Sequence, residues 1–388
     1  MKERTRLTSA TLGRLNSRRA VNTAVERGST VLMESAEVLY NDDIRPTYGT
    51  DGLSTQSELS RLIADLEGGF KSFLLPSGLA ALTVSMFAFL SAGDEILVVN
   101  STYAPVRRFL ETQLKRFGVV ARYYDPGLTP EAVIELATPS TRMIYVESPG
   151  SLTFDIQDIP GIARLARTRG ILTLCDNTYG SGVLFKPLAH GVDLAMQALT
   201  KYVGGHSDVL IGSVSVSDPA LAETLYAAIK ALGFFTSADE SYLATRGLRS
   251  LHLRLHQSAQ SGLKVMRWLQ ERPEVLKVVH PSLETHPNHD IFARDFSGPN
   301  GLFMVIFKGN GENQSRAFLN KLKLFGLGFS WGGYESLAVN CEPQIRARHR
   351  LSAEPDPYNT GSAIRFYVGL EDADDLIADI AQALSVFS

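Results

Sequence analysis

The chain has 388 residues, of which 44% are hydrophobic and 20% charged, and its formal net charge is -3. This length predicts two domains with substantial cores, and the near-balanced charge gives no reason to expect nucleic acid or an anionic membrane as a partner. No run of about 18 apolar residues is present, so we expect no membrane span. The 2 cysteines, Cys175 and Cys341, are too few for a disulfide framework or a cysteine-based metal site, which fits a reducing, cytoplasmic setting.

Residues 1–52 show little sustained periodicity and end in a turn-like stretch around Tyr48. A segment without a core of its own is either disordered or lies on another surface, such as a partner subunit. Its first residues, rich in Arg, Ser and Thr, are also typical of an organellar transit peptide. We interpret residues 1–52 as an N-terminal arm that contacts the neighbouring subunit.

Residues 53–240 predict a large α/β domain. A helix at 54–67 ends at Gly68-Gly69, and candidate strands then alternate with helices. The strands are expected at 70–75, 95–100, 119–124, 142–147, 171–175, 193–198 and 209–216. The helices are expected at 79–90, 105–117, 130–137 and 160–168. Because the strands are apolar nearly throughout, we expect a mostly parallel seven-stranded sheet with helices on both faces.

Residues 241–388 have a different pattern, which predicts a smaller C-terminal α+β domain. A long helix is expected at 240–271, across the start of this domain. Three strands and two helices follow, with expected strands at 276–279, 301–307 and 364–368 and expected helices at 313–323 and 374–387.

Polar or glycine residues follow five of the strands in the large domain, at the edge where parallel sheets bind ligands. They are Ser77-Gly78-Leu79, Ser101-Thr102-Tyr103, Ser148-Pro149-Gly150-Ser151, Asp176-Asn177-Thr178 and Thr200-Lys201. Taken alone, Lys201 is better explained as a surface lysine in a turn, and Asp176 as a turn cap. Together the five sets offer an anion site, an aromatic ring, a carboxylate, a hydroxyl and an amine, which favours a binding site.

These motifs resemble those of the fold-type I pyridoxal-phosphate enzymes of cysteine and methionine metabolism. The resemblance extends from about Val21 to the C-terminus, and the matching motifs occur in one order, which is more specific than any single pattern. The motifs that carry it are Arg27-Gly28-Ser29-Thr30, Leu66-Glu67-Gly68-Gly69, Pro76-Ser77-Gly78, Glu147-Ser148-Pro149-Gly150-Ser151, Asp176-Asn177-Thr178, Thr200-Lys201-Tyr202, Gly205-His206-Ser207-Asp208, Ser330-Trp331-Gly332-Gly333-Tyr334-Glu335-Ser336, Ile364-Arg365 and Gly369-Leu370-Glu371-Asp372.

The resemblance implies pyridoxal 5'-phosphate as the cofactor, and no metal. Lys201 would bind the cofactor covalently and later remove the α-proton of the substrate. Asp176 would face the pyridine nitrogen, and Tyr103 would stack on the ring and help to steer protons. The cofactor phosphate would be held by the backbone N–H groups of Gly78 and Leu79 and by the hydroxyl of Thr200.

For the substrate, the resemblance implies that Arg365 holds the α-carboxylate, with Ser330 and Trp331 beside it. Tyr48 would reach the phosphate and the substrate from the neighbouring subunit, so a homodimer or homotetramer with active sites at the subunit interface is expected. The plainer alternatives are a core tyrosine for Tyr48 and a surface ion pair for Arg365.

Two positions depart from the pattern of the family. Thr50 stands where members often carry arginine, and Ala198 stands where serine is common. Both substitutions remove a side chain that would bind the cofactor phosphate. Either another basic residue compensates for Thr50, or cofactor affinity is lower.

The stretch 147–151 and Trp331 look like the versions of these motifs in the β-lyases of the family. This implies β-elimination of L-cystathionine, a small amino-acid thioether, to homocysteine, pyruvate and ammonia in methionine biosynthesis. A γ-lyase or a cysteine desulfhydrase of the same family is the nearest alternative. A cofactor-binding scaffold or regulator without activity is the alternative from another class, although it would not need both an electron sink and a carboxylate clamp.

Overall fold

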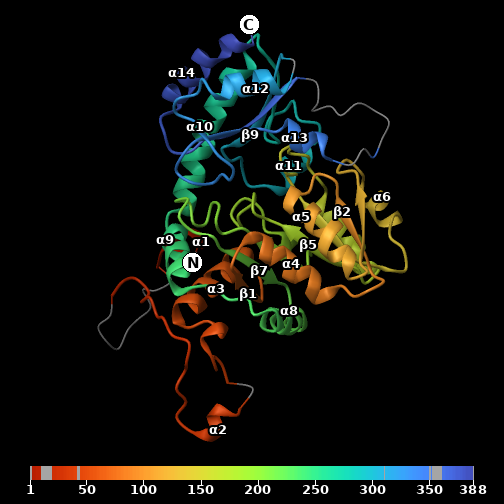
Figure 1. Cartoon of the computed structure of the whole chain (residues 1–388), viewed down its shortest axis with the longest axis vertical. Coiled ribbons are helices and arrows are strands. Elements are labelled where there is room, and N and C mark those ends of the chain that lie inside the picture. Colours follow the sequence, from red (N-terminus) through yellow and green to blue (C-terminus); the bar gives the residue numbers. More distant parts are fainter. Residues whose placement is uncertain are drawn as a thin grey trace.

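The computed structural model describes residues 2–9, 20–41, 44–309, 311–348, 351 and 361–387. Figure 1 shows their arrangement: the N-terminal arm, which carries helix α2 (Ala36–Leu39), projects from one end of the molecule. A large sheet fills the middle, and a smaller sheet with helix α14 (Ala373–Ala383) forms the other end. In the described residues, no helix combines the length and the apolar character that crossing a lipid bilayer requires.

The large sheet has seven strands in the order β1-β7-β6-β5-β4-β2-β3. Strand β7 is antiparallel to both of its neighbours, and all the other adjacent pairs are parallel. The strands are β1 (Lys71–Leu75), β2 (Glu95–Val99), β3 (Val120–Tyr124), β4 (Thr141–Glu147), β5 (Leu172–Asp176), β6 (Leu194–Gln197) and β7 (Gly212–Val216). The prediction of a mostly parallel seven-stranded sheet is confirmed.

Helices pack on this sheet, and the central strands β2, β4, β5 and β6 are short and almost wholly buried. Ser77 caps α4 (Gly78–Phe89) through its hydroxyl, which accepts from the N–H of Ala80, and the carboxylate of Asp158 caps α7 (Ile159–Thr168) by accepting from the N–H of Gly161. The expected helix at 105–117 continues from α5 as a π-helical turn at Leu110–Leu114. The helices are α3 (Ser54–Glu67), α4 (Gly78–Phe89), α5 (Ala104–Phe109), α6 (Pro130–Glu135), α7 (Ile159–Thr168) and α8 (Pro219–Leu232), with a 3₁₀ turn at Pro187–His190.

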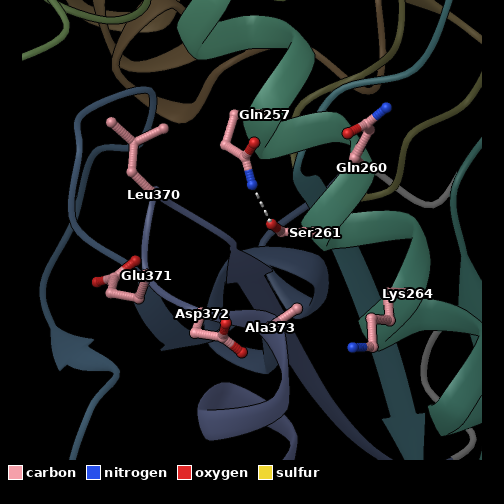
Figure 2. A pocket seen from close by; sticks show the side chains of 8 residues that line it. All are labelled: Gln257, Gln260, Ser261, Lys264, Leu370, Glu371, Asp372 and Ala373. Carbon is pink, nitrogen blue, oxygen red and sulfur yellow. Dashed lines mark hydrogen bonds between the residues drawn. The ribbon is translucent and has the colours of Figure 1, made fainter.

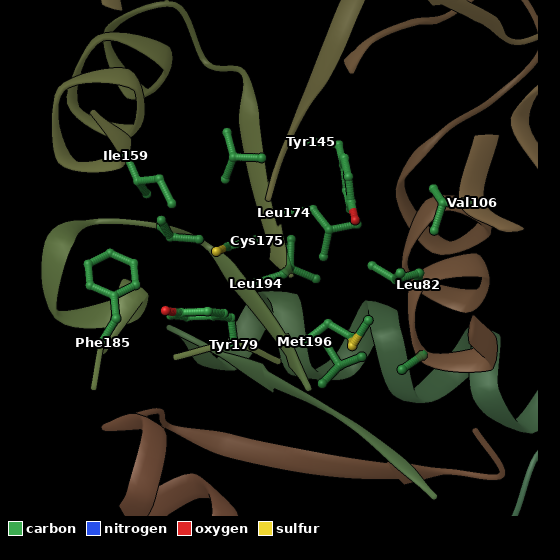
Figure 3. Close-up of a cluster of buried hydrophobic side chains, with 14 of the residues drawn as sticks. Leu82, Val106, Tyr145, Ile159, Leu174, Cys175, Tyr179, Phe185, Leu194 and Met196 are labelled. Atoms are coloured by element: carbon green, nitrogen blue, oxygen red, sulfur yellow. The ribbon is translucent and has the colours of Figure 1, made fainter. Parts of the chain in front are cut away.

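The core of the large sheet lies around β5 and β6. In Figure 3, Leu174 and Cys175 of β5 lie near Leu194 and Met196 of β6, among side chains from the surrounding helices. All of these side chains are almost completely buried. The strands that end at the candidate site are therefore fixed by packing on both sides.

The smaller sheet has five strands in the order β10-β11-β12-β9-β8, and its core is rich in phenylalanine. The strands are β8 (Val275–Val279), β9 (Leu302–Phe307), β10 (Gly326–Leu327), β11 (Leu337–Asn340) and β12 (Ser362–Tyr367). Its helices are α11 (His289–Asp295), α12 (Glu312–Leu319), α13 (Glu342–Arg346) and α14, which continues as a 3₁₀ turn at Leu384–Val386. The second, smaller domain of mixed structure is confirmed.

The single long helix expected at 240–271 is wrong. The structure has two helices, α9 (Ala238–Leu248) and α10 (Leu251–Gln270), separated at Arg249 and Ser250. Helix α9 packs on α3, whereas α10 runs to the smaller sheet. At the break, Gly247 lies so close to the turn that carries Lys201 that a Cβ on it would come within 2.1 Å of the Gly204 carbonyl oxygen. Only a glycine fits at 247 in this packing.

In its described residues, the N-terminal segment contains more regular structure than its sequence predicts. Helix α1 (Glu3–Ser9) packs on the same subunit, with Leu7 buried and Glu3 paired with Lys186. Beyond α2, the arm contains a 3₁₀ turn at Gly49–Asp51. An isolated bridge joins Thr30 to Tyr48.

Candidate active site

The carboxyl ends of β4, β5 and β6 lie side by side because these strands are parallel neighbours. In the register of the sheet, Glu147 at the end of β4 lies opposite Asp176 at the end of β5. Asp176 in turn lies opposite Met196, and the chain leaves β6 into the turn that carries Lys201. The topology thus brings the polar residues that follow these strands to one edge of the sheet.

Lys201 is mostly buried, and its ammonium donates a hydrogen bond to Ser330 Oγ at 2.5 Å. Burial, assisted by the positive charge of Arg365 and opposed by Asp176, lowers the pKa of Lys201 to about 8. The centre of the Trp331 ring lies 5.6 Å from the same nitrogen. Because the usual pKa of a lysine is about 10.4, far more of Lys201 is neutral and nucleophilic at physiological pH than for a surface lysine.

Asp176 is buried at the end of β5, and its Oδ1 accepts a hydrogen bond from the N–H of Thr178 at 2.9 Å. Burial raises the pKa of Asp176, while hydrogen bonds from Thr178 and the charge of Lys201 act in the opposite direction. A buried carboxylate in this position is complementary to a protonated ring nitrogen, which would favour its ionised form.

Tyr103 precedes α5 and keeps 44% of its surface exposed, so its ring is free on one side to meet a ligand. Burial raises the pKa of the Tyr103 phenol, with a further contribution from Asp176 and Glu147. The phenol is therefore protonated at neutral pH. The phenol can donate a proton, but it does not carry a negative charge at neutral pH.

Gly78 begins α4 in tight contact with the turn that follows β6. A Cβ on Gly78 would lie 2.6 Å from the Cβ of Ala198, so the two small residues depend on each other. The N–H groups of Gly78 and Leu79 are in the first turn of a 12-residue helix, where N–H groups lack intrahelical acceptors and the helix dipole favours an anion. The contact explains why position 78 is a glycine, and the structure gives no reason for alanine in place of serine at 198.

Thr200 is next to Lys201, but its hydroxyl is engaged with the backbone of Ile211. It donates to the Ile211 carbonyl at 3.1 Å and accepts from the Ile211 N–H at 3.0 Å. These bonds fasten the turn of Lys201 to the segment before β7. A hydroxyl has one hydrogen to donate, so the binding of a phosphate by Thr200 stays a prediction.

Arg365 on β12 approaches the same region from the smaller sheet. It is buried, and it donates a hydrogen bond to the carbonyl of Ser330 at 2.7 Å. Ser330 has a φ of 84°, in a region that residues other than glycine seldom adopt, and it also accepts from Lys201. The structure therefore brings Lys201, Ser330, Trp331 and Arg365 together.

Tyr48 does not join this group within one chain. It lies on the arm, half exposed, and its backbone N–H donates to Asp51 at 3.2 Å. The neighbouring Thr50 accepts a hydrogen bond from Lys230 on α8 at 2.9 Å, and Lys230 also pairs with Asp51 at 2.7 Å. A basic side chain thus stands beside Thr50.

A separate hollow of about 460 Å³ lies between α10 and the start of α14. Figure 2 shows its lining, in which Gln257 donates a hydrogen bond to Ser261. None of the residues predicted for the site lines this hollow. We assign the chemistry to the edge of the large sheet.

The residues at that edge fit a phosphorylated aldehyde that contains a basic aromatic ring. Lys201 suits attack on the aldehyde, Asp176 suits the ring nitrogen, and the start of α4 suits the phosphate. Within the described part of the chain, the buried Nε of Arg365 has no hydrogen-bond partner, which leaves a donor for a substrate carboxylate. The fold and the site define a pyridoxal-phosphate-dependent enzyme of fold type I.

Comparison with known proteins shows to which family of pyridoxal-phosphate-dependent enzymes the chain belongs. The family described as Cys/Met metabolism PLP-dependent enzyme matches residues 7–385. A putative cystathionine beta-lyase of Rhizobium johnstonii is 41% identical over 372 residues, which cover 95% of this chain and 92% of the relative. The cystathionine beta-lyase of Bordetella avium is 40% identical over 373 residues, covering 94% and 92%. The solved structure of metB from Corynebacterium glutamicum, 29% identical, matches with a TM-score of 0.91 over 100% of this chain and 99% of that one. The chain belongs to the Cys/Met metabolism family of PLP-dependent enzymes.

Glu147 is the site residue that sequence reasoning missed. Its Oε2 accepts hydrogen bonds from the backbone N–H of Tyr103 at 2.8 Å and from the Tyr145 hydroxyl at 2.9 Å. The sequence did contain one indication of its role. Glu147 is the last residue of a strand, and the neighbouring strand ends at Asp176. The sequence pattern indicated the motif 147–151 as a unit, but it predicted no separate role for Glu147.

Proposed function

We propose that the protein catalyses the PLP-dependent β-elimination of L-cystathionine to homocysteine, pyruvate and ammonia. The observation that carries this proposal is the position of the Lys201 amine, 2.5 Å from Ser330 and under the influence of both Asp176 and Arg365. A base placed between a cofactor partner and a carboxylate clamp suits α-proton removal from an amino acid. The names of the two bacterial relatives support cystathionine as the substrate.

The roles proposed for the side chains follow from their chemistry. Arg365 holds the substrate α-carboxylate with its guanidinium, and Ser330 and Trp331 border the same space. Bound pyridoxal phosphate supplies the electron sink for the carbon that loses its proton. Lys201 takes the proton from Cα and returns one to the departing sulfur, so the Cβ–S bond breaks and homocysteine leaves as a thiol. The remaining three-carbon fragment reacts with one water to give pyruvate and ammonia.

Cofactor binding is assigned to the other predicted residues. Asp176 faces the ring nitrogen, and Tyr103 stacks on the ring and helps to steer protons. The phosphate is bound by Gly78, Leu79 and Thr200, with Tyr48 from the neighbouring subunit. Lys230, which already contacts Thr50, is the basic residue best placed to compensate for the arginine that the family often carries there.

The products distinguish this proposal from its nearest alternative. Purified protein incubated with L-cystathionine is expected to release pyruvate and homocysteine in equal amounts, because β-elimination needs no proton from Cβ. Chromatography of the derivatised keto acids measures pyruvate, the product of β-elimination, and 2-oxobutyrate, the product of γ-elimination. Mainly 2-oxobutyrate would identify a γ-lyase, and faster pyruvate release from cysteine than from cystathionine would identify a desulfhydrase.

We also infer a homodimer or homotetramer whose active sites form at the subunit interface. The arm supports this because it projects from the subunit and exposes large apolar side chains: Leu32 is 91% exposed and Tyr40 is 82% exposed. The proposed division of the chain is 1–52 for the arm, 53–240 for the cofactor domain and 241–388 for the C-terminal domain. Two free, buried cysteines are compatible with a cytoplasmic location.

Mixing two inactive variants tests whether Tyr48 acts on the neighbouring subunit. In a hybrid of Tyr48→Ala and Lys201→Ala subunits, one site receives both native side chains. After random reassociation we expect about a quarter of wild-type activity. Each variant reassociated with itself is the control. Confirmed hybrids without recovered activity would show that each subunit completes its own site.

A further inference from the structure

Two carboxyl groups end neighbouring strands in the interior of the site. Glu147 on β4 and Asp176 on β5 are direct register partners in a parallel pair, so their side chains start from adjacent positions on the same side of the sheet. Each residue is only 8% exposed. Two negative charges in such a place repel each other strongly, because little water is present to screen them.

The contacts of the two carboxyl groups differ. Asp176 faces Lys201, whose positive charge favours the ionised aspartate. Glu147 has no such neighbour: in the described part of the chain, the titratable groups that act on it or respond to it are Asp176 and Cys175 of β5, Tyr145 of its own strand and the Tyr103 phenol. None of these groups carries a positive charge.

The proton of the pair therefore belongs on Glu147. Burial raises the pKa of Glu147 to about 8, and the charge of Asp176 contributes to the rise. A protonated carboxyl group still has acceptor capacity for the Tyr103 N–H and the Tyr145 hydroxyl. Through the first of these bonds, Glu147 fixes the backbone from which the Tyr103 ring projects.

We propose that Glu147 is a positioning residue that, in its protonated form, orients Tyr103 over the cofactor and leaves the single negative charge of the pair on Asp176. This inference rests on the proposed roles of Tyr103 and Asp176 toward pyridoxal phosphate, but not on the choice of substrate. A γ-lyase with this site would show the same dependence on Glu147.

Three variants test the proposal on the full-length holoenzyme. Glu147→Gln is neutral and keeps an acceptor oxygen, so the release of cofactor on dilution should stay within about twofold of wild type. Glu147→Leu has no acceptor and leaves the part-buried Tyr103 N–H without its partner, so cofactor release should be about tenfold faster. Tyr145→Phe removes the hydroxyl that Tyr145 donates to Glu147 without touching Tyr103, and it should behave like wild type. The visible circular dichroism of the bound cofactor, which reports the orientation of its ring, should change only in Glu147→Leu.

The protonation state of Glu147 can be tested separately, in the full-length protein from which the cofactor has been removed. Because the folded-state pKa of Glu147 is raised above its ordinary value of 4.5, the stabilisation from its proton is complete below about pH 4.5 and is lost as the pH rises through about 8. The melting temperature of Glu147→Gln, relative to wild type, should therefore increase over this interval. Glu67, which among the described glutamates is also buried with a raised pKa, titrates in both proteins and cancels in the comparison.

Three results would overturn the proposal. Cofactor release from Glu147→Gln that is as fast as from Glu147→Leu would show that an ionised glutamate is required. Equal effects of Tyr145→Phe and Glu147→Leu would show that the bond to Tyr103 is not the cause. If Glu147→Leu does not fold, a constant difference in melting temperature between Glu147→Gln and wild type across the same pH interval would by itself refute the protonated form.

Discussion

Lys201→Ala is expected to lose the visible absorbance of the lysine-bound cofactor and to reduce turnover by on the order of 10⁴-fold or more. The reason is that one amine is assigned two tasks, the covalent attachment of the cofactor and the transfer of the α-proton. The absorbance spectrum and the rate of pyruvate release measure the two losses. Lys264→Ala is a matched control, because Lys264 pairs with Asp374 at the surface, away from the site.

The pH dependence of cofactor binding to Lys201 is a second test of the role of this amine. Attack on an aldehyde requires the neutral form of Lys201, whose pKa burial lowers to about 8. In protein freed of cofactor, the rate of capture should rise with pH and level off above about 8, whereas an ordinary lysine would continue to gain up to about 10.4. Retention of cofactor absorbance and turnover in Lys201→Ala, or a capture rate still rising steeply at about pH 10, would contradict the assignment.

Arg365→Ala is expected to lower kcat/KM for cystathionine by on the order of 100-fold, while the cofactor spectrum remains close to that of wild type. Loss of one partner of a buried charged hydrogen bond costs about 3 kcal/mol, which corresponds to this factor. Arg365 also holds the carbonyl of Ser330 at 2.7 Å, so part of the loss would come through the position of Ser330.

Arg365→Lys separates charge from geometry. A lysine keeps the positive charge but cannot offer two parallel donors to a carboxylate, so an intermediate loss is expected, seen mainly in KM. Steady-state kinetics with cystathionine and with a substrate analogue that lacks the α-carboxylate measure the effect. The analogue should react equally poorly with wild type and both variants; a wild-type KM for cystathionine in Arg365→Ala would show that the carboxylate is bound elsewhere.

Much of the cofactor domain was predictable because its strands are short apolar runs separated by helices with clear start signals. The ends of β4, β5 and β6 in the structure lie within one residue of the expected ends at 147, 175 and 198. The positions of Asp176 and Lys201 at one edge then follow from parallel pairing. Strands of this kind have a simple signal, because burial on both faces demands apolar residues throughout.

The features that escaped prediction depend on contacts between distant parts of the chain. The break between α9 and α10 lies next to the close packing of Gly247 against Gly204 in the turn that follows Lys201, and no local pattern at 249–250 indicates such a contact. Helix α1 is stabilised by burial of Leu7 and by the pairing of Glu3 with Lys186. The importance of Glu147 appears only in the register of β4 with β5, because neither Tyr103, whose N–H donates to it, nor its neighbour Asp176 is close in sequence.

The fastening of the arm has a consequence for how subunits come together. Asp51 accepts from the N–H of Thr47 at 2.9 Å, from the Tyr226 hydroxyl at 2.8 Å and from Lys230 at 2.7 Å. Burial acts to raise the pKa of Asp51, but the hydrogen bonds from Lys230, Thr47 and Tyr48 outweigh it and lower the pKa to about 2. The stabilisation they give is present above the ordinary pKa of 3.8 and is lost only as the pH falls through about 2. If the protein forms the proposed dimer, a free subunit in mild acid retains the base of its arm in a preformed conformation, and docking onto a second subunit would require less loss of conformational freedom than a flexible tail would.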